Sequence, residues 1–146
     1  MPAGLVVSPY VRYLLAPPAQ HRVWWLATHL ATHAAVGGLR LSTRSGATGR
    51  DVFGESVCIE ELSVDPSYQR TGVATALMRA AEAWLAGRPD LAQTVSLGVE
   101  TDNAIAIRLY TKLGYAVAAR DGNPIVFRGG NGRPCHVMFK RLDRPA

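Results

Sequence analysis

One stretch of the chain decides its fold: Leu62-Ser63-Val64-Asp65-Pro66-Ser67-Tyr68-Gln69-Arg70-Thr71-Gly72-Val73-Ala74-Thr75-Ala76-Leu77-Met78. An apolar strand ends at a turn-forming Asp-Pro pair, and a helix begins shortly afterwards at small residues. The first turn of a helix carries backbone N–H groups without partners and a partial positive charge. The stretch therefore predicts an anion site, where Gly72 and Ala74 leave the backbone open to a diphosphate.

Three polar side chains of this stretch can add to the anion site. Thr75 supplies a hydroxyl, and Gln69 and Arg70 supply further hydrogen-bond donors. The spacing Gln-x-x-Gly-x-Ala excludes the dinucleotide fingerprint Gly-x-Gly-x-x-Gly, and no Gly-Lys-Ser/Thr follows as in a P-loop. An ordinary strand-to-helix turn is the alternative interpretation of the stretch.

Elements downstream of Val57 are predicted from apolar spacing and from turn residues. Val73, Leu77, Ala80, Ala81 and Trp84 recur at three- and four-residue steps, as in a helix with one buried face. The predicted elements are strands over Val57–Val64, Thr94–Thr101, Tyr115–Ala119 and Cys135–Leu142, helices over Thr71–Ala86 and from Asp102 or Asn103 to Leu113, and a partial loop over Asn123–Pro134.

The sequence upstream of Val57 is less clearly patterned. Val23–Leu41 predicts two strands joined near His33, and the glycines of Thr43–Ser56 predict a loop. Met1–Gln20 has no clear pattern, although Val11–Ala16 could form a short strand or a helical turn. Because a strand–helix–strand unit joins parallel neighbours, the element order predicts a mixed α/β sheet with a parallel pair at its centre.

Two motifs in this order resemble the GNAT superfamily of N-acetyltransferases. Ile59–Met78 resembles its acyl-CoA motif, and Asn103–Tyr115 (Asn-Ala-Ile-Ala-Ile-Arg-Leu-Tyr-Thr-Lys-Leu-Gly-Tyr) resembles its second motif. Val137–Leu142 is similar to the last strand of the family. The resemblance implies one α/β domain over residues 1–146, with a mixed, mostly antiparallel sheet, a central parallel strand pair and flanking helices. Family members usually place two helices before the first hairpin, so the N-terminal region of this chain is expected to be shortened.

The resemblance also implies acetyl-CoA as cosubstrate and a primary amine as acceptor. The backbone of the strand end is expected to pair with the pantetheine arm, the loop to cradle the pyrophosphate, and Asn103 to hold the arm or an ordered water. The amine then attacks the thioester directly, and the N–H near Val64 stabilises the oxyanion. The implied cofactor-binding residues are Leu62, Ser63, Val64, Gln69, Arg70, Thr71, Gly72, Val73, Ala74, Thr75 and Asn103.

Three residues are candidates for proton transfer. The resemblance places Tyr110 near the thioester sulfur, where a neutral phenol can protonate the departing thiolate; a packed helix aromatic is the alternative. Glu60 and Glu61 lie on the strand that leads to the CoA site and can attract a cationic amine and accept its proton. Strand alternation predicts that one of them faces the cleft, unless a bulge over Leu62–Val64 shifts the count. Glu60, four residues before Val64, is favoured, and a solvated or salt-bridged glutamate pair is the alternative.

Several acceptors and a second kind of function stay open. The paired glutamates favour a cationic small molecule or a peptide or protein amine. The alternative is a CoA-binding sensor or a non-catalytic subunit of a complex. A nucleic-acid partner has little support, because the net charge of +5 comes from scattered arginines that form no run.

Composition and chain length exclude other classes. A chain of 146 residues with 48% hydrophobic and 18% charged residues is a single globular domain. Its two cysteines cannot form a disulfide framework, and no signal peptide or membrane span is recognised, so a cytoplasmic protein is expected. His29 and His33 have no third ligand at metal-site spacing, so no metal is expected. Apolar surface left by a shortened N-terminal region would favour a homodimer.

Overall fold

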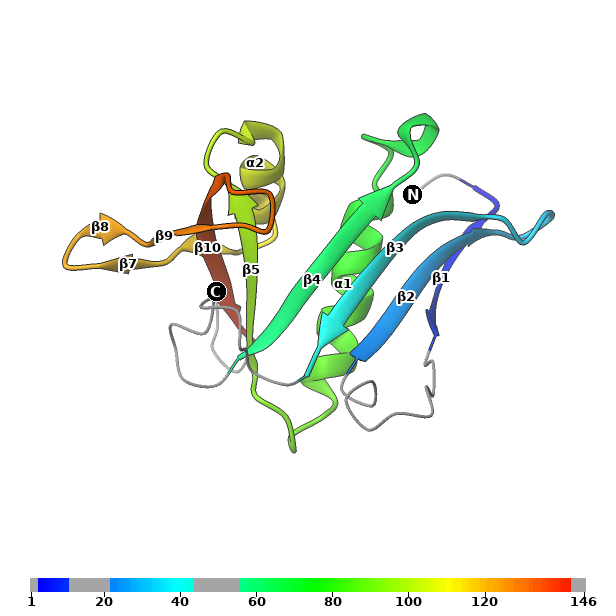
Figure 1. Cartoon of the computed structure of the whole chain (residues 1–146). Helices are drawn as coiled ribbons and strands as arrows, with labels where there is room; N and C mark the ends of the chain where they lie inside the picture. Colours follow the sequence, from blue (N-terminus) through cyan, green and yellow to red (C-terminus); the bar gives the residue numbers. More distant parts are fainter. Residues whose placement is uncertain (1–2, 11–21, 44–55, 143–146) are drawn as a thin grey trace.

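The computed structural model describes residues 3–10, 22–43 and 56–142, which form one twisted sheet with two helices. The order of its strands is β1 (Leu5–Tyr10), β2 (Arg22–His29), β3 (Ala35–Ser42), β4 (Val57–Val64), β5 (Thr94–Glu100), β10 (Pro134–Arg141) and β6 (Ala116–Val117), and β9 (Val126–Arg128) pairs with β10. Its pairings are antiparallel except that of β4 with β5, which is parallel. The mixed, mostly antiparallel sheet with a central parallel pair is therefore confirmed (Figure 1).

The elements follow the predicted order closely. The hairpin near His33, the strand over Val57–Val64, and both helices are present, and a separate ribbon pairs β7 with β8. The remaining elements are a 3-10 turn over Pro66–Tyr68, α1 over Val73–Ala86, α2 over Ala104–Lys112, and the ribbon strands β7 over Ala119–Arg120 and β8 over Asn123–Pro124.

Three sequence predictions need correction. The unpatterned N-terminal stretch contains β1, whose Leu5 is buried in the core, so a strand was missed there. Helix α1 begins at Val73, two residues later than predicted, because Gly72 takes a left-handed conformation (φ 91°) that a helix cannot include. The strand predicted over Tyr115–Ala119 is split into β6 and β7. The predictions for Val11–Ala16 and for most of the Thr43–Ser56 loop lie outside the described residues.

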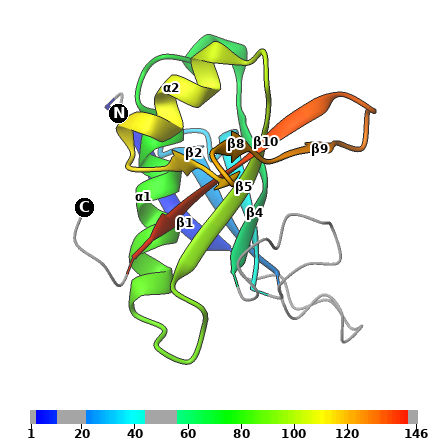
Figure 2. The same cartoon turned by 90° about the vertical axis from the view of Figure 1, so that its left-hand side faces the viewer.

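The main core lies between α1 and the sheet. Of the predicted apolar face of α1, Val73, Leu77 and Ala81 are buried and Ala80 and Trp84 are half-buried against the core. Met78 and Leu85, which were not predicted, are buried as well. Figure 2 shows both helices on the same side of the sheet. Gly37 on β3 permits close contact, because a Cβ there would lie 3.1 Å from the Ser63 carbonyl and 3.2 Å from Val73 Cγ1. This contact sets the start of α1 against the ends of β3 and β4.

Leu77→Ala tests this core. Leu77 is fully buried at the centre of the α1–sheet interface, so its truncation leaves a cavity and lowers the free energy of unfolding by roughly 2–5 kcal/mol. Urea denaturation followed by circular dichroism measures the change. Leu30→Ala, at a position with 61% exposure, is the matched control and should change stability by less than about 0.5 kcal/mol. Equal losses in the two variants would contradict this description of the core.

Candidate active site

The strands β4 and β5 pair over a short length and then diverge. Their pairing joins Val57 to Val95, Cys58 to Ser96 and Ile59 to Leu97, and within the described residues it goes no further. On its other edge β4 remains paired with β3 as far as Val64. Figure 1 shows the resulting V between the two strands. The edge of β4 beyond Ile59 therefore offers backbone groups to an extended ligand, as an edge strand does.

A cleft of about 610 Å³ opens between the end of β4, the start of α1 and helix α2. A volume of this size is typical of small-molecule sites. The cleft brings together most of the predicted site residues, which come from segments some forty positions apart in the chain. It is lined by Leu62, Val64, Tyr68, Gln69, Arg70, Gly72, Ala74, Thr75, Asn103, Ile105, Ala106, Leu109 and Tyr110.

The loop before α1 presents bare backbone to the cleft. Arg70 and Gly72 both have positive φ angles, 62° and 91°, which turn the chain sharply into the helix. The first helical bond runs from the Ala76 N–H to the Gly72 carbonyl, and no described side chain caps the helix start. The preceding N–H groups of the first turn thus have no partner within α1, which is the arrangement that binds anions.

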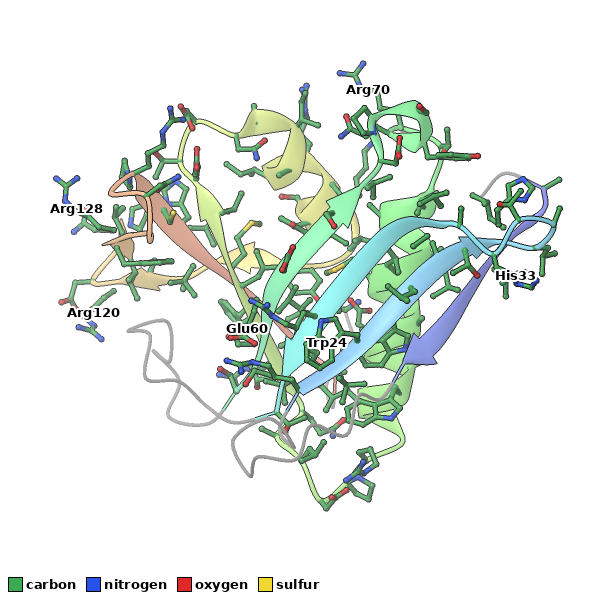
Figure 3. The ribbon with its side chains drawn as sticks, turned by 45° about the vertical axis from the view of Figure 1, so that its right-hand side comes forward. Trp24, His33, Glu60, Arg70, Arg120 and Arg128 are labelled. Carbon is green, nitrogen blue, oxygen red and sulfur yellow. The ribbon has the colours of Figure 1, made fainter. Side chains whose placement is uncertain are left out.

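The polar side chains of this loop differ in their contacts. The Gln69 side-chain amide donates to the Val64 carbonyl at 3.2 Å, which ties the loop to the end of β4. The Thr71 hydroxyl donates to the Tyr68 carbonyl. Arg70 is exposed at the outer end of the loop, as Figure 3 shows. Gln69 therefore has a structural bond in addition to any ligand contact, whereas Arg70 lines the cleft from an exposed position at its rim.

Helix α2 forms the opposite wall. Asn103 Oδ1 accepts a hydrogen bond from the Ala106 N–H at 3.1 Å, so this side chain caps the helix and also lines the cleft. Tyr110 is partly buried, and its ring meets the Tyr115 ring edge-on, with 6.1 Å between centroids. Burial raises the pKa of Tyr110 above its ordinary value of 10.0, because a phenolate is poorly solvated there. The phenol is consequently protonated at neutral pH.

Three of the predicted cofactor residues do not line the cleft. Val73 is 1% exposed and belongs to the core, so it can contribute only its backbone. Thr71 belongs to the loop before α1, and its side chain is exposed. Ser63 lies opposite Gly38 and lines a neighbouring hollow of about 400 Å³ that also touches Val64. Conversely, Tyr68, Ile105, Ala106 and Leu109 line the cleft but were not predicted, although the three- and four-residue steps that place Ala106 and Leu109 beside Tyr110 could have indicated the α2 residues.

The two candidate glutamates do not alternate across the sheet. The register pairs Arg40 with Glu61 but Leu41 with Ile59, so Glu60 is the extra residue of a β-bulge. The bulge was expected over Leu62–Val64 and lies before it instead. Because a bulge interrupts alternation, both carboxylates reach Arg40, with distances of 3.4 Å for Glu60 and 3.5 Å for Glu61. The prediction that strand alternation separates the two side chains is therefore wrong.

Both glutamates lie on what we call the open face, the face of β2, β3 and β4 that is opposite α1 and carries Trp24 and Arg40. Figure 3 shows Glu60 and Trp24 together on this face. Arg22 Nε donates to Glu60 at 2.9 Å, so the Glu60 carboxylate contacts two guanidinium groups and is 15% exposed. The Glu61 side chain is 59% exposed and has the single contact with Arg40 among the described residues.

Neither a metal cluster nor a membrane span is found in the described ranges. No group of three or more His, Cys, Asp or Glu side chains there could hold a metal ion. In the same part of the chain, no helix is long and apolar enough to cross a bilayer.

Comparison with solved structures shows a shared fold. Ard1 from Thermoplasma volcanium superposes with a TM-score of 0.65 at 24% identity, covering 83% of this chain and 71% of that one. The ribosomal-protein-S18-alanine N-acetyltransferase from Escherichia coli superposes with a TM-score of 0.62 at 22% identity, covering 87% of this chain and 73% of that one. The PaiA N-acetyltransferase from Thermoplasma acidophilum, in complex with coenzyme A, superposes with a TM-score of 0.60 at 18% identity, covering 83% of this chain and 61% of that one. At these identities the likeness concerns the fold alone.

The sequence comparisons decide the family. No curated protein matches the chain. The model of the acetyltransferase (GNAT) family matches residues 7–115, which is most of the chain and includes both motifs, the diverging strands and the cleft. The chain therefore belongs to the GNAT family of acetyltransferases.

Proposed function

We propose that this protein is an N-acetyltransferase that moves the acetyl group of acetyl-CoA to a primary amine by direct attack. One observation carries the proposal: a single cleft joins an uncapped helix start, an unpaired strand edge and a protonated tyrosine. These are the groups needed for a diphosphate, an amide-containing arm and a leaving thiolate. Membership of the family and the coenzyme A complex of a structural neighbour support the same substrate.

The cleft fits the three parts of the cosubstrate. The diphosphate is assigned to the first-turn N–H groups of α1, with Thr75 and Arg70 as additional donors. The pantetheine arm is assigned to the backbone edge of Leu62–Val64, which β5 leaves unpaired in the described structure. Asn103, at the start of the opposite wall, is assigned to the same arm.

The chemistry requires one proton to leave the amine and one to reach the sulfur. A neutral amine attacks the thioester carbonyl, and the backbone N–H near Val64 stabilises the oxyanion. The carbon–sulfur bond then breaks, and the Tyr110 phenol donates its proton to the thiolate. The raised pKa of Tyr110 keeps the phenol protonated at neutral pH, so its own ionisation does not reduce the rate there.

The acceptor is assigned to the open face. Leu62 and Val64 line the cleft, and by strand alternation Glu61 and Ser63 face the other way, opposite Arg40 and Gly38. Val64 lines both the cleft and the hollow beside the open face, so the amine is assigned an approach along this strand end. The exposed Glu61 carboxylate is the better placed group to attract a cationic amine and accept its proton, because Glu60 already contacts Arg22 and Arg40.

The acceptor class that this arrangement favours is a cationic small molecule or a peptide or protein amine. The hollow beside the open face is lined by Asp65, whose Oδ1 accepts a hydrogen bond from the Ser67 N–H, together with apolar and glycine surface. Homodimerisation and a cytoplasmic location stay predictions. Saturable acetyl-CoA binding without transfer to any amine would support the alternative, a CoA-binding sensor or a non-catalytic subunit.

Gly72→Glu should abolish acetyl-CoA binding. The substitution places a carboxylate beside the assigned diphosphate and forces a side chain into a left-handed conformation (φ 91°). Isothermal titration calorimetry measures the affinity, and we expect a loss of at least about 100-fold, or 2.7 kcal/mol. Gly122→Glu, also at positive φ but in the β7–β8 turn with open space around it, is the control. Unchanged affinity in the Gly72 variant would contradict the diphosphate assignment.

Tyr110→Phe should lower kcat by roughly 100-fold while the acetyl-CoA dissociation constant stays within about twofold. The phenyl ring keeps the packing against Tyr115 and removes only the proton donor. Release of the CoA thiol, measured with a thiol reagent, gives kcat, and calorimetry gives the affinity. An unchanged kcat would remove Tyr110 from the reaction.

The variants Glu61→Gln and Glu60→Gln distinguish the proposed catalytic role of Glu61 from the structural role of Glu60. Glu61→Gln should lower kcat/KM for a cationic amine by roughly 100-fold, because it removes the exposed carboxylate. Glu60→Gln should mainly lower stability, by about 1 kcal/mol, because it disrupts ion pairs with half-exposed arginines. Thiol-release kinetics and urea denaturation of both variants provide the comparison. A larger kinetic loss in the Glu60 variant would reverse the assignment.

A further inference from the structure

Helix α2 carries the proposed proton donor, and its side chains are less deeply buried than those of α1. None of the residues of this helix, Ala104–Lys112, is fully buried. The helix nevertheless supplies Ile105, Ala106, Leu109 and Tyr110 to one wall of the cleft. The helix packs the half-buried Ala106, Ile107, Leu109 and Tyr110 against the core, but it buries none of them fully. Contacts at its ends therefore add substantially to what fixes its position.

A buried carboxylate lies beneath the C-terminal end of α2. Glu82 projects from α1 and is 8% exposed. Its Oε2 accepts a hydrogen bond from the Tyr115 hydroxyl at 2.9 Å, and its Oε1 accepts one from Lys140 Nζ at 2.8 Å. Arg79 lies 3.5 Å from Oε1. Both oxygens are thus occupied, as a buried charge requires, and losing one partner is costly.

Two partners of Glu82 also hold α2 directly. Lys140 Nζ donates a second hydrogen bond to the Leu113 carbonyl at 2.8 Å, at the C-cap of the helix. The Tyr115 backbone N–H donates to the Tyr110 carbonyl at 2.9 Å. The Tyr115 ring also meets the Tyr110 ring edge-on, with an interplanar angle of 61°. The cluster of Glu82, Tyr115 and Lys140 therefore fixes the backbone and ring of Tyr110 from the side opposite the cleft.

We propose that Glu82 is a positioning residue that acts through Tyr115 to hold the Tyr110 phenol at the reacting sulfur. This inference rests on the proposed function, in which Tyr110 is the proton donor. The carboxylate fixes the Tyr115 hydroxyl, and the Tyr115 ring limits how the Tyr110 ring can tilt. Proton transfer depends on hydrogen-bond distance, so a small displacement of the phenol reduces kcat more than it reduces cosubstrate affinity.

A double-mutant cycle tests the dependence on Tyr110. Tyr115→Phe keeps the ring and removes the hydroxyl that Glu82 holds, and it should lower kcat about tenfold with the acetyl-CoA dissociation constant within about twofold. In the Tyr110→Phe background the same substitution should cause no further loss, because the group it positions is gone. A purely structural role predicts that the two losses multiply. Multiplying losses, or a Tyr115→Phe variant with unchanged kcat, would overturn the proposal.

A second readout does not depend on activity. In protein labelled with ¹³C-tyrosine, NMR ring signals of Tyr110, assigned through the Tyr110→Phe spectrum, should shift in Tyr115→Phe and in Glu82→Gln. Asp90→Asn is the control; it removes an exposed ion pair with Arg88 and should leave these signals in place. If Glu82→Gln does not fold, Tyr115→Phe alone decides. Unmoved Tyr110 signals overturn the proposal.

The two readouts separate the inference from the proposed function. If Tyr110→Phe itself leaves kcat unchanged, the proton-donor assignment fails, and with it the role of Glu82 in the reaction. Shifted ring signals would then show that Glu82 positions the α2 wall and not a proton donor.

Discussion

The site depends on the loss of backbone pairing between β4 and β5 beyond Ile59. A parallel pair at the centre of a sheet normally continues to the strand ends, and its hydrogen bonds would then leave no room for a ligand. Here the extra residue at Glu60 changes the course of β4 while its pairing with β3 is kept. The edge of β4 next to β3 thereby stays hydrogen-bonded, whereas the edge next to β5 is unpaired beyond Ile59 in the described part of the chain. The cleft lies beside this unpaired edge, and the bulge places both glutamates near Arg40.

Stability and function are divided between the two helices. Helix α1 is fixed by a continuous buried face, which holds its uncapped start, the proposed diphosphate site, at the end of the sheet. Helix α2 packs half-buried side chains on the core, is further held at its ends by the Asn103 cap and by the Glu82 cluster, and forms the less buried wall. A wall held in this way can be adjusted by single side chains beneath it, which links the buried Glu82 carboxylate to the geometry of Tyr110.

The sequence predicts the central part of this protein well, because local chemistry dictates it. Gly72 and Ala74 favour an open helix start, the apolar spacing of α1 favours a helix with one buried face, and Asn103 favours a capped helix start. The features that were missed depend on tertiary contacts. Strand β1 has no distinctive pattern and is recognised by its pairing with β2, and Leu5 becomes a core residue only in that context. The bulge at Glu60 is a property of the register with β3, so neither strand reveals it alone.

Titration of the purified protein with acetyl-CoA in a calorimeter tests the central claim most directly, namely that the space between the diverging strands is an acyl-CoA site. The proposal predicts saturable binding with one molecule per chain, followed by release of free thiol when a suitable amine is added. Absence of binding would contradict the assignment of the cleft, whatever the family of the chain.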